Sequence, residues 1–91
     1  SGENHDMSAY MEKLLRASGQ DAPQVKRVLE LNIGHPAMGK IKTLFETDKD
    51  SEQLKDYTHL LLDMAIIGEG GKLENPARFS KLVGELMSSA I

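Results

Sequence analysis

Few residues of this 91-residue sequence combine the types and the spacing that chemistry requires. His59 and Asp63 are four positions apart, so on a helix they would share one face and could hold a metal ion. A zinc site needs three or four ligands, and no further histidine or acidic residue is patterned to join these two. We therefore interpret them as a solvated polar pair, and we expect no metal, no catalytic residue and no cofactor in this chain.

The glycine-rich segment 68–72 (Gly-Glu-Gly-Gly-Lys) has the composition of a phosphate-binding loop but not the flanking residues and elements of one. Such a loop lies between a strand and a helix, and its lysine is followed by serine or threonine. Here the glycines follow a predicted helix, and Leu73 stands after the lysine. We interpret the segment as a turn.

Asp50-Ser51 at a predicted helix start raises a different function. Carrier proteins that bear a phosphopantetheine arm are small, acidic and helical, and they attach the arm to the serine of an Asp-Ser-Leu motif. Glu52 stands here where the apolar residue is expected. Capping of the helix by Asp50 or Ser51 explains the same residues without a function, so a carrier protein is kept as the less favoured alternative.

Apolar periodicity predicts four helices as the elements that position these residues. The first begins after Asp6, its expected N-cap, and carries apolar residues at i, i+3, i+4, i+7 and i+8. The second begins at His35-Pro36, with proline where the missing N–H costs nothing. The third covers about 51–67, with Asp50 as its expected N-cap, and Asn75-Pro76 begins the last.

Residues 25–32 (Val-Lys-Arg-Val-Leu-Glu-Leu-Asn) favour a short strand instead. Leu29 and Leu31 alternate with polar residues, and Pro23 is expected to keep the preceding segment out of a helix. A single strand cannot satisfy its own backbone. Either this prediction is wrong or the partner strands belong to a larger parent protein, and we favour the second interpretation.

The last two predicted helices form an apolar hairpin. The stretch from Leu60 to Ile67 is apolar nearly all round, so it must be covered on more than one side. Because the chain offers few other elements, a second copy is the natural cover, and two hairpins would make a four-helix bundle. The predicted fold class is therefore mainly α, with four helices and one short strand, and α+β in the parent domain.

Composition narrows the class of partner. Eleven Lys and Arg against fourteen Asp and Glu give a net charge of −3 without a basic stripe, which argues against nucleic acid. No apolar run approaches the roughly eighteen residues of a membrane span, so we expect no membrane partner and a cytoplasmic location. The sequence has no cysteine, so a chain this short lacks a covalent staple and is expected to need a partner.

Four segments in one order carry a resemblance to a known family. They are Met7 to Leu15, the Glu-Leu-Asn of 30–32 with His35-Pro36, Leu60 to Ala65, and Gly70 to Pro76. Together they resemble the C-terminal dimerization domain of the ninety-kilodalton heat-shock chaperone family, of the bacterial HtpG type. The resemblance assigns residues 3–91 to that domain, with its N-terminal strands missing, and leaves Ser1-Gly2 as a possible cloning scar.

The resemblance implies a homodimer that also binds unfolded or partly folded client proteins. ATP and Mg belong to another domain of the parent chaperone, so this chain is expected to have no ATPase activity of its own. A purely structural dimerization module without a client role remains the alternative, because an apolar stripe is also what core packing produces. The implied dimer-interface residues are Leu61, Met64, Ala65, Phe79, Leu82, Val83, Leu86 and Met87, and the implied client-binding residues are Met7, Tyr10, Met11, Leu14 and Leu15.

Overall fold

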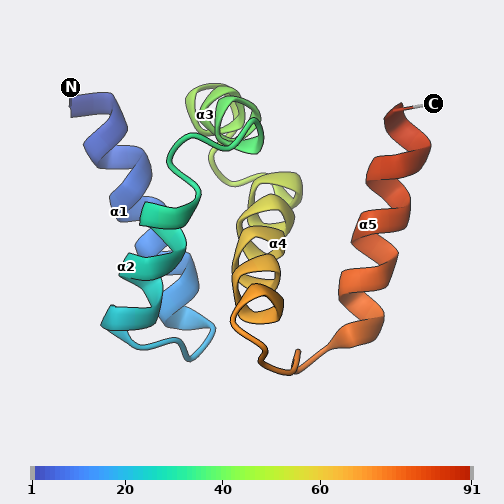
Figure 1. The fold of residues 1–91 in the computed structure, drawn as a ribbon. Helices are drawn as coiled ribbons and strands as arrows, with labels where there is room; N and C mark the ends of the chain where they lie inside the picture. The colour runs from blue at the N-terminus through green and yellow to red at the C-terminus, as the bar shows by residue number, and fades with distance from the viewer. Residues whose placement is uncertain (1, 91) are drawn as a thin grey trace.

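The chain folds into five helices joined by short connections (Figure 1). The computed structural model describes residues 2–90, and the side chains of residues 6–89. The mainly α class is confirmed, whereas the expected count of four helices and one strand is wrong, because residues 2–90 contain no strand. The helices are α1 (Gly2–Ala17), α2 (Ala22–Leu31), α3 (Ala37–Thr47), α4 (Glu52–Gly68) and α5 (Pro76–Ala90).

The segment 25–32, predicted as a strand, forms most of α2. Val25 and Val28 lie three positions apart on one face and are buried, whereas Leu31 is largely exposed. The helical spacing of the two valines therefore outweighs the alternation of leucines that favoured a strand. A helix also pairs its backbone within its own segment, so this chain needs no partner strand.

Local capping explains why α2 begins where it does. The Asp21 carboxylate accepts a hydrogen bond of 2.8 Å from the backbone N–H of Gln24, which is the usual N-cap arrangement. Pro23 lies in the first turn, where its missing N–H would have no partner in any case. The expectation that Pro23 prevents a helix here was therefore wrong.

Two other predicted helix starts differ from the structure. The helix α1 begins at Gly2, so Asp6 lies within its second turn and is not its N-cap. The N-cap of α4 is Ser51, whose hydroxyl accepts from the N–H three residues on at 3.0 Å, and not Asp50. Asn75 caps the first turn of α5 in the same way, at 3.0 Å, as the Asn-Pro pair predicted.

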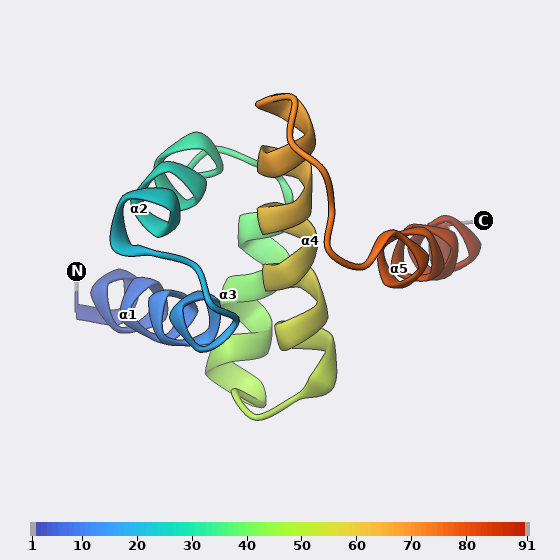
Figure 2. The same ribbon diagram turned by 90° about the horizontal axis from the view of Figure 1, so that it is seen from below.

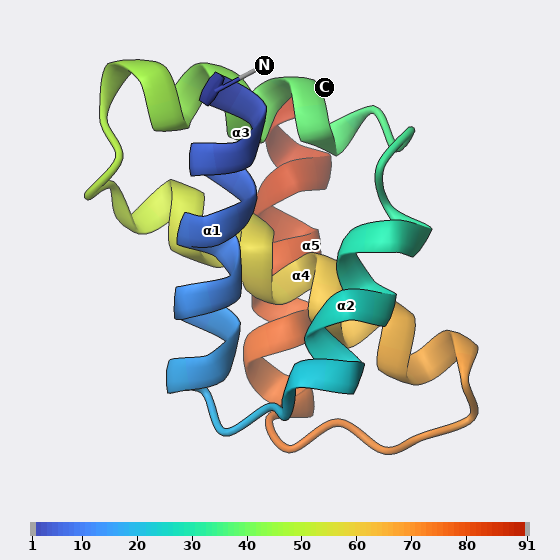
Figure 3. The same cartoon turned by 90° about the vertical axis from the view of Figure 1, so that its left-hand side faces the viewer.

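The hydrophobic core lies where α1, α2 and α3 pack on α4 (Figure 2). Figure 3 shows α1 and α2 side by side in front of α4. Because α2 is a helix, the chain supplies more cover for α4 than the sequence suggested, and that cover does not come from a second copy. The buried core side chains are Met7, Met11, Leu15, Val25, Val28, Ile41, Leu54, Leu61, Leu62 and Ala65.

The last helix, α5, stands apart from this core. It crosses α4 at a steep angle (Figures 2 and 3), and within residues 2–90 it packs on no other helix. The turn between them needs glycine: Gly70 has a φ of 82°, and the Gly71 N–H donates to the Ile66 carbonyl at 2.8 Å. A Cβ on Gly71 would lie 2.9 Å from Cγ2 of Ile66. The interpretation of the glycine-rich segment as a turn is therefore confirmed.

Candidate dimerization interface

The α4–α5 hairpin exposes large apolar side chains on its outer surface. Met64 and Ile67 of α4 are 47% and 48% exposed, and Met87 of α5 is 61% exposed. Each belongs to a helix whose opposite face is already packed within the chain. Contiguous exposed apolar patches are typical of surfaces that contact another molecule, and Met64 lies beside the exposed Leu31 of α2.

The predicted interface residues fall into three groups by depth. Leu61 and Ala65 belong to the core against α1 and α2, so their contacts lie inside the chain. Leu82 is buried as well, on α5. Phe79, Val83 and Leu86 are half-buried, and Met64 and Met87 are exposed. The predicted interface residues that a second copy could contact are therefore the half-buried and exposed ones, and the exposed Ile67 joins them.

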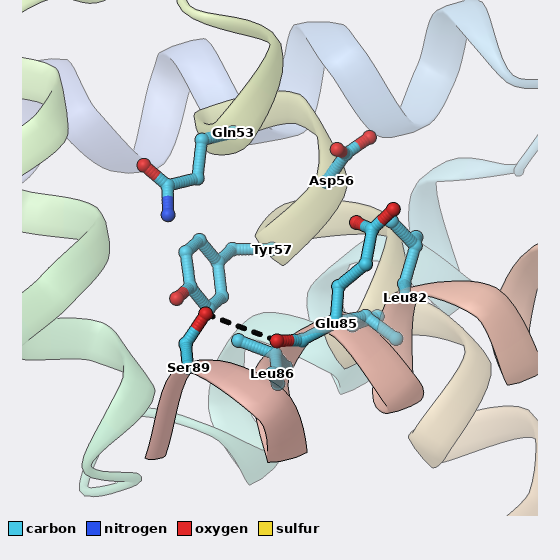
Figure 4. Close-up of a pocket in the computed structure, with 8 residues that line it drawn as sticks. Gln53, Asp56, Tyr57, Leu82, Glu85, Leu86 and Ser89 are labelled. Carbon is cyan, nitrogen blue, oxygen red and sulfur yellow. Dashed lines mark hydrogen bonds between the residues drawn. The ribbon is translucent and has the colours of Figure 1, made fainter. Parts of the chain in front are cut away.

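A hollow of about 130 Å³ separates α4 from α5 toward the open end of the hairpin (Figure 4). Tyr57 and Leu86 supply apolar walls, and the carboxylates of Asp56 and Glu85 come from the two facing helices. The Ser89 hydroxyl donates to the Glu85 backbone carbonyl at 3.0 Å, a bond within α5. The two helices thus do not close on each other here, which leaves α5 weakly held along this half.

The predicted client-binding stripe faces the core in this structure. Met7, Met11 and Leu15 are buried, the last two completely. Tyr10 packs against Phe45 of α3, with ring centroids 5.6 Å apart at an interplanar angle of 53°. Leu14 is half-buried, like Tyr10. The structure therefore brings the five residues together on one face of α1, and that face contacts α2, α3 and α4.

An apolar hollow opens beside the first turns of this stripe. It has a volume of about 360 Å³ and is lined by Met7, by Leu29 and Ile33 at the end of α2 and by Met38 of α3. Ile33 is 81% exposed. Sequence reasoning missed Ile33, because residues 25–32 were interpreted as a strand that ends before it.

His59 and Asp63 do share a helix face, but they are not a solvated pair, so that interpretation was wrong. Asp63 is only 6% exposed. His59 is half-buried: its Nε2 lies 2.6 Å from the Ser18 hydroxyl, and its Nδ1 lies 2.8 Å from the Lys55 carbonyl. Because that carbonyl can only accept, Nδ1 carries a proton. The imidazole therefore ties α4 to the end of α1.

Burial raises the pKa of the Asp63 carboxyl above its ordinary value, because the charged form loses water. The positive charges of Arg78 and His59 oppose this shift, and the negative charge of Glu74 adds to it. A raised pKa in the folded state means that the folded chain holds this proton more tightly than the unfolded one. The contribution of Asp63 to stability is therefore largest at acidic pH and falls as the pH rises from the ordinary value through the raised one.

The described side chains contain no group of three or more His, Cys, Asp or Glu residues placed to hold a metal ion. Within the described part of the chain, no helix is both long enough and apolar enough to cross a membrane.

The comparisons with known proteins identify the family. A family model described as "Hsp90 protein" matches residues 1–91, so the chain belongs to the Hsp90 family. Among curated relatives it is similar to the chaperone protein HtpG of several bacteria. It is 47% identical to that of Geobacter metallireducens over 85 residues, and 42% identical to that of Nitrosococcus oceani over 85 residues. These alignments cover 93% of this chain and 13% of each relative.

A third relative extends the match along the chain. The chaperone protein HtpG of Frankia casuarinae is 41% identical over 90 residues, which are 99% of this chain and 14% of that protein. The chain thus spans about a seventh of the length of the curated relatives it matches. No solved structure matches the chain.

Proposed function

We propose that this chain is the C-terminal dimerization domain of an HtpG-type chaperone, and that two copies pair through their α4–α5 hairpins as an intermolecular four-helix bundle. The membership of the Hsp90 family and the names of the relatives support a role in a chaperone. The single observation that carries the dimer is the exposure of Met64, Ile67 and Met87 on a hairpin whose second helix packs on α4 alone.

Association itself is tested by sedimentation of the 91-residue chain across a hundredfold range of concentration. We expect a monomer–dimer equilibrium, and a melting temperature that rises with concentration because association stabilises the folded chain. A single monomeric species with a melting temperature independent of concentration would contradict the dimer.

A matched pair of variants tests where the two copies meet. The double variant Met64→Gln, Met87→Gln places polar groups on the proposed interface and should weaken association at least tenfold. Ile33→Gln is the control, because Ile33 is even more exposed and lines the hollow beside Met7, to which neither α4 nor α5 contributes a residue. Equal loss of association in the control would place the contact elsewhere.

A client-binding role of α1 is the second candidate function. The observation that favours it is the open apolar hollow beside Met7, because an exposed apolar hollow with two methionines can fit many apolar segments. In this form Met7 is the stripe residue that lines the hollow, and Tyr10 and Leu14 are half-buried, while Met11 and Leu15 would reach a client only if α1 moved off the core.

Polar substitution separates the client role from core packing. Leu14→Gln should reduce suppression of client aggregation by the full-length chaperone while the isolated chain still folds, because Leu14 is half-buried. Met11→Gln, which buries an amide in the core, should unfold the isolated chain and serves as the control. If Leu14→Gln leaves aggregation suppression unchanged, the chain is a structural dimerization module without a client role.

The remaining properties concern the whole protein. We propose that the parent chaperone is cytoplasmic and binds ATP and Mg through another domain. This chain alone should hydrolyse no ATP above the rate of a buffer blank, and measurable hydrolysis by the purified chain would contradict that assignment.

A further inference from the structure

At the turn end of the α4–α5 hairpin, a second hollow of about 230 Å³ surrounds the buried Asp63 carboxyl. Its lining comes from four parts of the chain. The end of α1 and the turn after it supply the neutral Ser18 and Gln20. The other charged or titratable groups that line it are His59 on α4, Glu74 in the connection to α5, and Arg78 in the first turn of α5.

Asp63 is 6% exposed as a residue, and its carboxyl faces this hollow without a hydrogen-bond partner among the described side chains. The ion pairs of residues 6–89 lie elsewhere, so Arg78 influences Asp63 only from beyond 4 Å. The carboxyl oxygens keep some contact with solvent through the hollow, and fuller hydration of the carboxylate would relieve the cost of its partial burial. Movement of α5 away from α4 would open the hollow, since α5 and the connection before it form one of its walls.

This movement need not disturb the core. Among the residues that the structure describes, α4 is the only helix that α5 packs on, and the side chains of the core cluster come from α1 to α4. Docking and undocking of α5 are therefore separable from folding of the rest of the chain.

We propose that Asp63 is a proton-operated latch of the hairpin: protonation of its carboxyl tightens the docking of α5 on α4, and ionisation loosens it. The direction follows from the burial of Asp63 in the docked form alone. Docked Asp63 has a raised pKa, whereas undocked Asp63 would return toward the ordinary value of 3.8. The equilibrium constant for docking is then largest below pH 3.8. It falls as the pH rises toward the raised pKa of docked Asp63, by up to about tenfold for each pH unit between the two pKa values.

The latch also regulates the proposed dimer, and this part rests on the proposed function. Met64 lies on α4 and Met87 on α5, so undocking of α5 would separate the two helices that carry the proposed interface. Acidification within the titration range of Asp63 should therefore raise both α5 docking and dimer affinity, in parallel.

Docking is measured directly by the distance between two spin labels across the hairpin. The sequence has no cysteine, so Gln53→Cys and Ser89→Cys place one label on each helix, at positions that line the hollow of Figure 4. We expect the short-distance population to fall as the pH rises from 4 to 7.5. A label pair at Lys13→Cys and Lys42→Cys, on α1 and α3, should not change.

Four variants in the labelled chain assign the effect. Asp63→Asn should abolish the pH dependence and keep α5 docked at pH 7.5. Asp56→Asn is the matched control on the same helix, removes the same charge, and should leave the pH dependence intact. Arg78→Gln should move the midpoint to higher pH and Glu74→Gln to lower pH, since their charges act on Asp63 in opposite directions. An unchanged profile in Asp63→Asn, or the same loss in Asp56→Asn, would overturn the latch.

Sedimentation of the same variants separates the two proposals. Docking that responds to pH through Asp63 in a chain that stays monomeric at every pH would sustain the latch and overturn the dimer. A dimer whose affinity and docking are identical in wild type and Asp63→Asn at every pH would sustain the dimer and overturn the latch.

Discussion

The two ends of this chain meet the same helix in different ways. Helices α1, α2 and α3 enclose one side of α4 with side chains such as Met11, Val28 and Ile41, which have no exposed surface. On the other side, Leu82 is the one side chain of α5 within residues 76–89 that becomes nearly inaccessible. The difference shows that the apolar content of a helix does not tell whether its apolar side chains are covered within the chain. The burial of those side chains does.

The comparison also explains why the proposed second copy would cover α5. Its apolar arc runs from Leu82 on the α4 side to Met87 on the outer side, so a single neighbouring helix cannot cover it. The other side of α4 is covered by three helices, and the large exposed apolar side chains there, Leu31 and Ile33, lie at and just after the end of α2 and not on α4.

The largest expected effect comes from Leu61→Ala, which tests the completeness of the core. Leu61 is 1% exposed and lies in the cluster shared with α1 and α2. Its truncation should lower the free energy of unfolding of the whole chain by about 2–5 kcal/mol, since a cavity remains where surrounding helices cannot collapse. Urea unfolding followed by circular dichroism measures it. A loss of less than about 1 kcal/mol would mean that this side of α4 is packed as loosely as the other.

Truncation of Leu82 gives the matching measurement on α5. Leu82→Ala should cost about 2–3 kcal/mol, at the lower end of the range for buried leucines, because α5 has only one neighbour to lose. The loss should be confined to α5: hydrogen exchange of its amides should rise at least tenfold while those of α1 to α3 stay protected. Equal loss of protection in α1 would show that the two regions unfold as one.

The turn that joins the regions is expected to be less sensitive. In Gly71→Ala the new Cβ would lie 2.9 Å from Cγ2 of Ile66 and 3.2 Å from its carbonyl oxygen, so the backbone must shift. Overpacking of this kind costs about 1–3 kcal/mol. Gly84→Ala, within α5 and with nothing near its Cβ, is the control and should be neutral or slightly stabilising. Thermal melting at one protein concentration distinguishes the two.

The helical periods of α1, α4 and α5 could be predicted from sequence, and so could the Asn75 cap and the glycine turn. The nature of 25–32 could not, because Leu29 and Leu31 alternate while Val25 and Val28 have helical spacing, and tertiary contact decides between such patterns.

The candidate site shows the same limit. Periodicity identifies the apolar side chains of a helix but not the neighbour that each one meets, so Leu61 and Ala65 were grouped with Met64 although they face the core. The burial of Asp63 was missed for a related reason. Four separate segments of the chain line the hollow around Asp63. The spacing between His59 and Asp63 concerns only α4 and gives no information about the other three segments.

The smallest expected effect comes from Ser51→Ala, at the start of the helix that both regions share. Loss of the hydroxyl that accepts from the N–H of Leu54 should cost about 1 kcal/mol. Because α4 supports the core and α5 alike, the loss should appear equally in the unfolding of both regions, unlike that of Leu82→Ala. Asp50→Ala is the matched control, since Asp50 is exposed and caps nothing here, and it should change the unfolding free energy by less than about 0.5 kcal/mol. If Asp50→Ala lowers the free energy of unfolding more than Ser51→Ala does, Asp50 and not Ser51 is the N-cap of α4. The cap at Ser51 then does not stabilise the helix that both regions share.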